Sequence, residues 1–273
     1  MSRYRISVIM GIYNCAKTLV EALDSLYAQT YQDFQIIMCD DGSIDNTYTI
    51  AQEYAKNHSN IILLKNDCNR GLNYTLNYCL EYVDTEYVAR MDGDDISLPT
   101  RFEKEIAFLD SHPEYAIVSC PMIYFDENGD YRKGTAVEHP TISNFIKGSP
   151  FCHAPMLIKT DAIKAVNGYT DDKRFLRIED YNLFMKLYKA KYIGANIQEH
   201  LYKMRDDRNA FSRRTMQARF NSTRARLIAY KTLGIRWYKY HYAFRPIVIG
   251  IIPYPIYQYL RNLKHKKEFT KPM

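Results

Sequence analysis

Tyr87-Val88-Ala89-Arg90-Met91-Asp92-Gly93-Asp94-Asp95 is an apolar run that leads into three carboxylates within four residues. Acids crowded at the end of a strand repel one another, which favours a cation bound among them. Asp92 and Asp94 are two residues apart, so an extended segment points both side chains the same way, and Gly93 permits a close turn between them. Their oxygens suit Mg²⁺ or Mn²⁺. The alternative is an acidic, solvated turn that closes a strand.

The segments before this stretch alternate between strand and helix patterns. Continuous apolar runs predict buried strands at Ile6–Ile12, Phe34–Cys39, Ile61–Leu64 and Tyr87–Met91. Apolar residues at helical spacing, and capping residues before the second segment, predict helices at Lys17–Tyr27, 47–57 and Asn73–Tyr82. This alternation predicts an α/β fold with a mainly parallel sheet covered on both faces.

Polar groups follow three of these strands: Tyr13-Asn14, Asp40-Asp41, and Asp92 with Asp94. Each could be an ordinary turn or a helix-capping loop. Because ligands of parallel sheets collect at the carboxyl ends of the strands, we expect the three groups to share one crevice. The sequence has neither GxGxxG nor GxxxxGK[ST], so neither a Rossmann dinucleotide site nor a P-loop is indicated.

The composition is that of a folded globular protein, with 273 residues, 47% hydrophobic and 25% charged. Six cysteines are scattered without a CxxC pair, which favours buried thiols in a reducing compartment over disulfides or a zinc site. The first five residues lead straight into a strand with no apolar signal region, so we expect a cytoplasmic protein.

Charge is distributed unevenly along the chain. Residues 203–273 contain 17 Lys and Arg against 3 acids, net +14, whereas residues 1–202 contain 20 against 28, net −8. An apolar segment, Ile247–Leu260, lies in the basic part and is broken by Pro253 and Pro255, so it is too short to span a bilayer. Aromatic, aliphatic and basic residues together predict a segment that lies in an anionic membrane interface. A C-terminal helix packed on the body, with solvated lysines, is the alternative.

The second half of the chain offers further candidate residues. We expect a helix at Pro99–Leu109, a long strand at Tyr115–Phe125 followed by a turn at 126–129, and an irregular loop at 147–156. His153 in that loop either contacts substrate or is a buried, hydrogen-bonded histidine. Glu179 and Asp180 begin an amphipathic helix, where acids complement the helix dipole; alternatively, one of them is a general base.

Several motifs together resemble those of family-2 inverting glycosyltransferases with the GT-A fold. They are Ser7–Asn14, Cys39-Asp40-Asp41-Gly42-Ser43, Asn69-Arg70-Gly71-Leu72-Asn73, Arg90–Asp95, Pro99–Lys104, His153–Met156, Gly168-Tyr169 and Glu179-Asp180-Tyr181. Order and separations are similar, and the resemblance covers roughly residues 5–215. The chain looks most like the bacterial enzymes that build capsule, exopolysaccharide or lipopolysaccharide.

The resemblance implies a nucleotide-sugar donor, in particular a UDP-sugar. Ile12 and Tyr13 would cradle the base, Tyr13 would stack on uracil, and Asp41 would accept its N3–H. Arg70 would contact the base or the diphosphate, and Asp92 would reach the ribose.

The same resemblance assigns the metal and the base. Asp94, with Asp92, would hold Mn²⁺ or Mg²⁺ on the diphosphate, and Asp95 would orient the site. Asp180 would be the general base that deprotonates an acceptor hydroxyl, with Glu179 as the reserve candidate. His153 and Arg205 would contact the acceptor or the diphosphate.

One expected residue is missing, because many relatives carry a metal-binding histidine after the last strand of the sheet. Here Arg205 is followed by Asp206 and Asp207. Asp206 could replace the histidine as an oxygen ligand, or Arg205, Arg213 and Arg214 could stabilise the diphosphate directly.

These features predict three regions and one leading function. Residues 1–98 form the nucleotide-sugar-binding half and 99–215 the acceptor-binding and catalytic-base half of one GT-A domain, and 216–273 form a basic helical extension. The leading function is metal-dependent, inverting sugar transfer, of class EC 2.4, to a lipid-linked glycan at the inner face of the plasma membrane. A non-catalytic nucleotide- or sugar-binding module is the first alternative. A nucleic-acid-binding protein is the second, but the basic region has no recognition motif, so no nucleic-acid partner is expected.

Overall fold

The computed structural model describes residues 3–170, 172, 175, 178–206 and 215–252. Its centre is a sheet with the strand order β10-β6-β9-β4-β1-β2-β3. The strands are β1 (Ile6–Ile12), β2 (Phe34–Asp40), β3 (Ile61–Lys65), β4 (Tyr87–Arg90), β6 (Tyr115–Ser119), β9 (Leu157–Lys159) and β10 (Ile193–Asn196). Apart from β9, which runs antiparallel to β4 and β6, the pairs within this described sheet are parallel. The predicted α/β fold with a mainly parallel sheet is confirmed.

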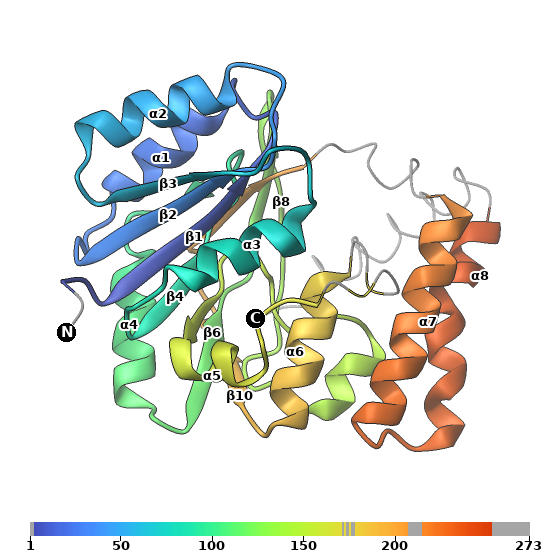
Figure 1. The fold of residues 1–273 in the computed structure, drawn as a ribbon. Helices are drawn as coiled ribbons and strands as arrows, with labels where there is room; N and C mark the ends of the chain where they lie inside the picture. Colours follow the sequence, from blue (N-terminus) through green and yellow to red (C-terminus); the bar gives the residue numbers. More distant parts are fainter. Residues whose placement is uncertain (1–2, 171, 173–174, 176–177, 207–214, 253–273) are drawn as a thin grey trace.

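Helices cover both faces of this sheet, as Figure 1 shows. They are α1 (Leu19–Tyr27), α2 (Thr47–Asn57), α3 (Leu72–Glu81), α4 (Arg101–Ser111), α5 (Thr160–Ala165) and α6 (Glu179–Lys189). Successive residues of a strand face opposite ways, so Ile9 packs in the core beneath α3, α5 and α6, while Val8 packs beneath α1 and α4. The fully buried runs that predicted the central strands therefore serve two cores.

A second, smaller sheet lies beside the first, with the order β5-β11-β7-β8. Its strands are β5 (Ile96–Ser97), β7 (Ile123–Asp126), β8 (Gly129–Lys133) and β11 (Tyr202–Arg205). The prediction of one long strand at Tyr115–Phe125 is wrong, because β6 and β7 belong to different sheets. Pro121 lies between them, and a residue without an N–H cannot continue a central ladder. The predicted turn at 126–129 is confirmed and joins β7 to β8.

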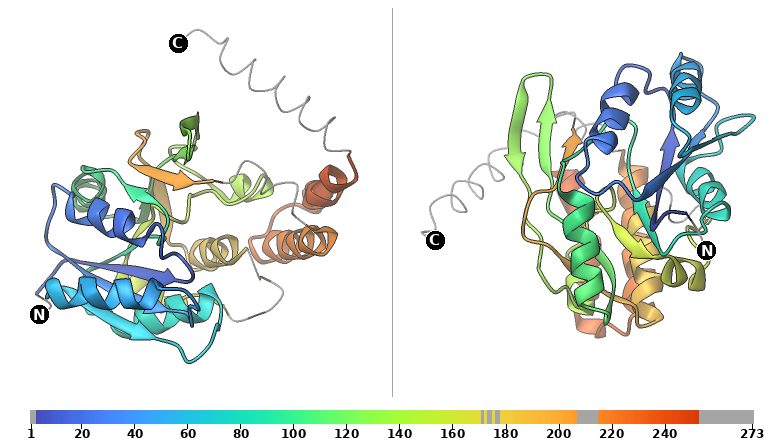
Figure 2. Two further views of the ribbon diagram at one scale, coloured as in Figure 1. Left: turned by 90° about the horizontal axis from the view of Figure 1, so that it is seen from above. Right: turned by 90° about the vertical axis from the view of Figure 1, so that its left-hand side faces the viewer.

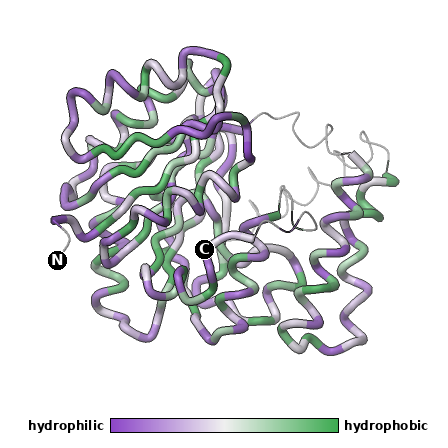
Figure 3. Tube along the Cα trace, viewed as in Figure 1, coloured by the Kyte–Doolittle hydropathy of each residue, from purple (hydrophilic) through white to green (hydrophobic). Residues whose placement is uncertain are grey.

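The extension after residue 215 is helical through residue 251. A short 3-10 helix, η1 (Ile142–Ile146), and α6 support α7 (Met216–Thr232), which is followed by η3 (Trp237–Phe244) and α8 (Arg245–Ile251). Figure 3 shows that hydrophilic and hydrophobic residues are mixed along α7. Among the described helices, none is both long enough and apolar enough to cross a bilayer. The rest of Ile247–Leu260, from residue 253 on, lies outside the described residues.

Candidate active site

The carboxyl ends of β1, β2 and β4 meet at one edge of the sheet, where the sequence predicts a shared crevice. A pocket of about 550 Å³ opens there, lined by Gly11, Tyr13, Asn14, Cys15, Lys17, Thr18, Asp45, Asp92, Gly93, Asp94 and Arg205. The Tyr13 side chain is 46% exposed, as a ring that stacks on a ligand must be. Ile12 is instead fully buried in the core, and its carbonyl accepts the Asp41 N–H at 2.9 Å. The Ile12 side chain therefore does not line this pocket, and its expected contact with the base stays a prediction.

Asp41 organises the loop that carries Arg70. One carboxylate oxygen of Asp41 accepts the Arg70 N–H and the Asn66 side-chain amide, both at 2.8 Å, and the other accepts the Gly71 N–H at 2.9 Å. The Arg70 guanidinium lies 5.4 Å from the centre of the Tyr74 ring. Asp41 is 4% exposed, and its first role is to fix this loop. The oxygen that accepts only the Gly71 N–H keeps a lone pair that could accept an N–H of a base.

The acidic stretch after β4 turns sharply against the β1–α1 loop. A Cβ atom on Gly93 would lie 2.8 Å from the Cys15 sulfur, and the Gly93 carbonyl accepts the Thr18 hydroxyl at 2.9 Å. Burial, and then the negative charge of Asp92, raise the pKa of Asp94. Burial, Asp92 and Asp94 raise the pKa of Asp95 to about 8. The expected crowding of these carboxylates is present.

This donor set fits a divalent cation at Asp94 and Asp92. Both side chains line the pocket, and the mutual repulsion seen in the pKa of Asp94 is what a bound cation relieves. Among the described residues, no group of three or more His, Cys, Asp and Glu side chains stands ready as a complete metal shell. Two carboxylates with diphosphate oxygens from a nucleotide are a usual arrangement for Mg²⁺.

Arg90 is a site residue to which the sequence analysis assigned no role. It ends β4 with 4% of its surface exposed, and its guanidinium forms an ion pair with Asp92. Tyr202 on β11 lies behind the same stretch, where its hydroxyl accepts the Asp92 N–H at 3.3 Å. A charged residue that closes an otherwise apolar, buried strand was the available signal for Arg90.

Asp180 and Glu179 lie in the first turn of α6, as predicted. Burial raises the pKa of Asp180, while a backbone N–H and the Ser149 side chain, which hydrogen-bond to it, oppose the shift. Burial raises the pKa of Glu179 as well, and the charge of Asp180 adds to the shift. Burial raises the pKa of Tyr169; the Arg90 cation opposes the shift, and the charges of Glu179, Asp92 and Asp180 add to it. Tyr169 therefore lies in an electrostatic neighbourhood that includes the acids after β4 and those at the start of α6.

His153 is a hydrogen-bonded histidine at the back of this neighbourhood. Its Nε2 lies 2.8 Å from the Tyr169 hydroxyl, and its ring packs edge-on against Phe184. Burial, and then the Arg90 cation, hold its pKa well below the usual value, so the ring is neutral. Its predicted contact with acceptor or diphosphate stays a prediction.

Arg205 reaches the acidic stretch from β11. Its Nε donates to the Asp94 carbonyl at 3.0 Å, its backbone N–H donates to Asp95 at 2.8 Å, and its guanidinium also pairs with Glu21. Asp206 is engaged elsewhere, because it accepts the Tyr131 hydroxyl at 2.6 Å. Arg213 and Arg214 lie outside the described residues.

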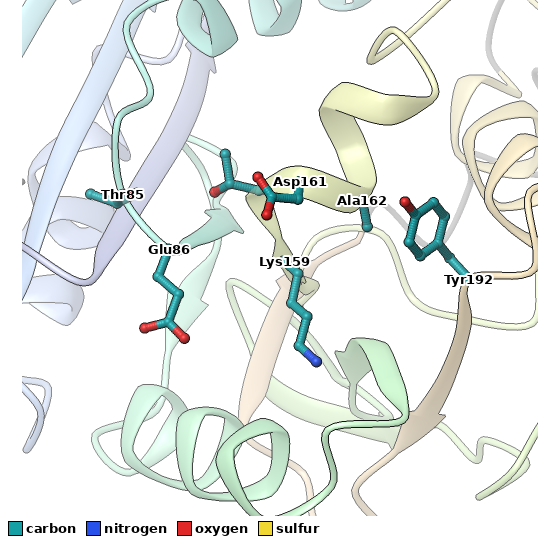
Figure 4. Close-up of a pocket in the computed structure, with 7 residues that line it drawn as sticks. Thr85, Glu86, Lys159, Asp161, Ala162 and Tyr192 are labelled. Carbon is teal, nitrogen blue, oxygen red and sulfur yellow. The ribbon is translucent and has the colours of Figure 1, made fainter.

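A second, smaller pocket of about 230 Å³ lies at the opposite edge of the sheet, where β4 begins and β9 ends. Figure 4 shows its lining, with Glu86, Lys159 and Asp161 at one side and Tyr192 at the other. Lys159 is held by the Pro113 carbonyl at 2.8 Å. None of the predicted site residues lines this pocket.

Comparisons with known proteins identify relatives of this chain. EpsE of Bacillus subtilis, named as a glycosyltransferase, is 37% identical over 264 residues, which are 96% of this chain and 94% of EpsE. The amylovoran biosynthesis glycosyltransferase AmsE of Erwinia amylovora is 32% identical over 73% of this chain and 75% of its own.

Solved structures share the fold. Staphylococcus aureus TarS 1–349 in complex with UDP-GlcNAc has a TM-score of 0.68 at 20% identity, over 88% of this chain and 73% of its own. The GT-A fold expected from the sequence is confirmed. Residues 7–167 match the sequence profile of Glycosyl transferase family 2. The chain belongs to this family and is a glycosyltransferase.

Proposed function

We propose that this glycosyltransferase moves a sugar from a UDP-linked donor to a hydroxyl of a glycan acceptor, with inversion at the transferred carbon, in the synthesis of a surface polysaccharide. The observation that carries the proposal is the pocket at the carboxyl ends of β1 and β4, where Asp92 and Asp94 lie together with the exposed ring of Tyr13. The TarS complex with UDP-GlcNAc supports the choice of donor.

The nucleotide is held by the first part of the chain, residues 1–98. Tyr13 stacks on the base, Asp41 accepts an imide N–H while fixing the loop of Arg70, and Asp92 meets the ribose. A stacking side chain at the mouth of the pocket fits this role, since aromatic rings recognise bases through their faces.

A divalent cation, Mn²⁺ or Mg²⁺, is held by Asp94 with Asp92, and when bound it neutralises the charge that develops on the departing diphosphate. A solved structure with a similar fold, the mannosyltransferase PcManGT of Pyrobaculum calidifontis, is in complex with GDP-Man and Mn²⁺. Its TM-score is 0.61 at 17% identity, over 99% of this chain and 82% of its own. Arg205 holds the backbone of Asp94 and adds positive charge at the same edge.

Asp180 acts as the base, within the acceptor half formed by residues 99–215. A carboxylate whose pKa is raised by burial takes a proton more readily than a solvated one. The acceptor hydroxyl attacks the anomeric carbon of the donor sugar from the side opposite the diphosphate and gives its proton to Asp180, while the bond from that carbon to the diphosphate oxygen breaks and UDP leaves. Attack from the opposite side inverts the configuration at this carbon. Glu179 is the alternative base, and His153 stays a candidate acceptor contact.

The acceptor is a lipid-linked glycan, and residues 216–273 bring the enzyme to an anionic membrane surface on the cytoplasmic side. A relative in Escherichia coli, UDP-Gal:alpha-D-GlcNAc-diphosphoundecaprenol beta-1,3-galactosyltransferase, is 29% identical over 83% of this chain and 86% of its own. Trp237 and Ile251 are 82% and 71% exposed, in a segment that also contains the basic residues Arg236 and Arg245. Exposed apolar side chains flanked by cations suit an anionic interface.

The test is a screen of nucleotide sugars for Mn²⁺-dependent release of the nucleoside diphosphate, without an added acceptor and then with lipid extract. We expect slow hydrolysis of one or a few UDP-sugars and faster turnover with extract. Tight UDP binding with no turnover of any donor would instead indicate a non-catalytic binding module.

A further inference from the structure

The side chain of Arg90 is a buried cation beside Asp92, which lines the pocket. It ends β4, which is paired with β1 on one side and β9 on the other, and it is 4% exposed. Burying a charge is unfavourable unless that charge is paired and hydrogen-bonded. An arginine at this place therefore either forms a structural ion pair or has a role in ligand binding or catalysis.

The backbone of Arg90 is fixed from both sides. Its N–H donates to the Met156 carbonyl at 3.1 Å, and its own carbonyl accepts the Arg101 guanidinium at 3.0 Å. Arg101 is itself fully buried and paired with Glu105. The guanidinium of Arg90 consequently projects from a rigid base, as a group that positions another must.

The guanidinium pairs directly with the acidic stretch that follows β4. One of its terminal nitrogens pairs with Asp92, while its Nε has no partner among the described residues. Its positive charge also opposes the raised pKa values of Glu179 and Asp180 at the start of α6. Arg90 therefore holds Asp92 by direct contact and acts on the start of α6 only through its charge.

We propose that Arg90 is a positioning residue that holds Asp92 in the orientation needed by the donor. The inference rests on the role of Asp92 proposed above. With one oxygen of Asp92 taken by Arg90, the other is directed to the ligand. A single contact between one guanidinium nitrogen and one carboxylate oxygen fixes Asp92 and leaves its second oxygen for the ligand.

The proposal predicts losses in both donor binding and turnover. Arg90→Met keeps much of the volume but removes the charge and the ion pair, so we expect weaker UDP binding and a fall in kcat/KM of about 10²-fold, as for a misplaced reacting group. Arg90→Lys keeps the charge, so we expect it to recover a large part of both. A role in packing alone predicts the reverse order, because Met suits an apolar core better than Lys.

The experiment measures UDP binding by calorimetry and turnover with the donor found in the screen, on the full chain with Mn²⁺. The variants are Arg90→Met, Arg90→Lys, Asp92→Asn and the double variant Arg90→Met/Asp92→Asn. Arg5→Met is the matched control, because Arg5 pairs with Glu86 and Asp110 on the body of the protein. Melting temperatures show whether each variant is folded.

We expect the loss caused by Asp92→Asn to be much smaller when Arg90 is already Met, because the two residues act as one unit. The proposal is overturned if Arg90→Met binds UDP and turns over like Arg5→Met, if Lys is no better than Met, or if the two losses simply add. If Asp92→Asn alone is silent, the proposed role of Asp92 fails. If Asp92→Asn is impaired and folded Arg90→Met is not, only the inference on Arg90 fails.

Discussion

Replacing Gly42 by alanine should push the loop after β2 away from the loop at Cys68 and Asn69; both loops lie on the proposed nucleotide side of the cleft. Gly42 follows Asp40-Asp41 with a φ of +71°, and an added Cβ would lie 2.6 Å from the Cys68 carbonyl carbon and 2.8 Å from the Asn69 nitrogen. Both contacts are with backbone, which cannot rotate away. The loop at Cys68 and Asn69 must move, and it leads into Arg70, whose N–H binds Asp41.

Gly234 is the matched control, because it has almost the same backbone but open space. Its φ is +68°, and an added Cβ would meet nothing within 4 Å. Gly234→Ala should therefore cost only the left-handed conformation, about 1–2 kcal/mol. Gly42→Ala should cost that plus a clash of about 1–3 kcal/mol. The reduced entropy of the unfolded chain is the same for both and cancels.

The assay is thermal unfolding of the two variants, followed by calorimetric titration with UDP. An extra 1–3 kcal/mol lowers the melting temperature of Gly42→Ala by roughly 2–12 °C more than that of Gly234→Ala. At a temperature where both are folded, only Gly42→Ala should bind UDP more weakly, by about tenfold, as expected for one lost charge-assisted hydrogen bond. Equal losses of stability and unchanged UDP affinity in both would refute the reasoning.

Three further predictions concern protons, stability and the extension. Burial and mutual repulsion raise the pKa of Asp94 and raise that of Asp95 to about 8, so Mn²⁺ binding should release protons and become tighter from pH 6 to pH 8. Calorimetry in buffers of different ionisation enthalpy measures the number of protons released, and no release would contradict this prediction. Burial raises the pKa of Glu105 to about 8 against the opposing effect of its partner Arg101, so its contribution to stability is present below about pH 4.5 and is lost as the pH rises through 8. Relative to wild type, Glu105→Gln should gain in melting temperature from pH 5 to pH 8.5, and a constant difference would contradict the assignment. The full chain should sediment with anionic vesicles, and salt should weaken this binding without abolishing it. A protein deleted from Phe244 onward should no longer sediment with the vesicles but should still bind UDP. Equal partitioning of both proteins onto neutral and anionic vesicles would rule this out.

Strands β1 to β4 of the main sheet were predictable because they read as continuous apolar runs, whereas the short strands β9 and β10 of the same sheet were not predicted. Ile6–Ile12 is predicted and observed with the same bounds. The edge that carries the site followed from the order of these strands, since parallel strands bring their carboxyl ends together.

The second sheet could not be predicted from the sequence in the same way. Its strands are two to five residues long, and β5 pairs with β11 across more than a hundred residues, Ser97 with Tyr202. Such short segments carry too little periodicity to be recognised. Pro121 was the one local signal that the run at Tyr115–Phe125 is broken.

In the candidate site, too, some features could be predicted from the sequence and others could not. The acids after β4 and at the start of α6 stand out as clusters in the sequence, whereas the buried position of Arg90 depends on Met156 and Arg101, which fold around it. The fixed loop of Arg70 likewise depends on Asp41, some thirty residues earlier. Charge partners of this kind are set by tertiary contacts and not by spacing.

The most direct measurement of the proposed mechanism compares Asp94→Asn with Asp180→Asn in two assays, UDP binding with and without Mn²⁺ and transfer of sugar from the donor. Asp94→Asn should lose turnover together with the tightening of UDP by Mn²⁺. Asp180→Asn should bind UDP like the wild type yet transfer about 10²–10⁴-fold more slowly, as for loss of a general base. Near wild-type turnover in either folded variant, or an equal loss of UDP binding in both, would contradict the division between a donor site at Asp94 and a base at Asp180.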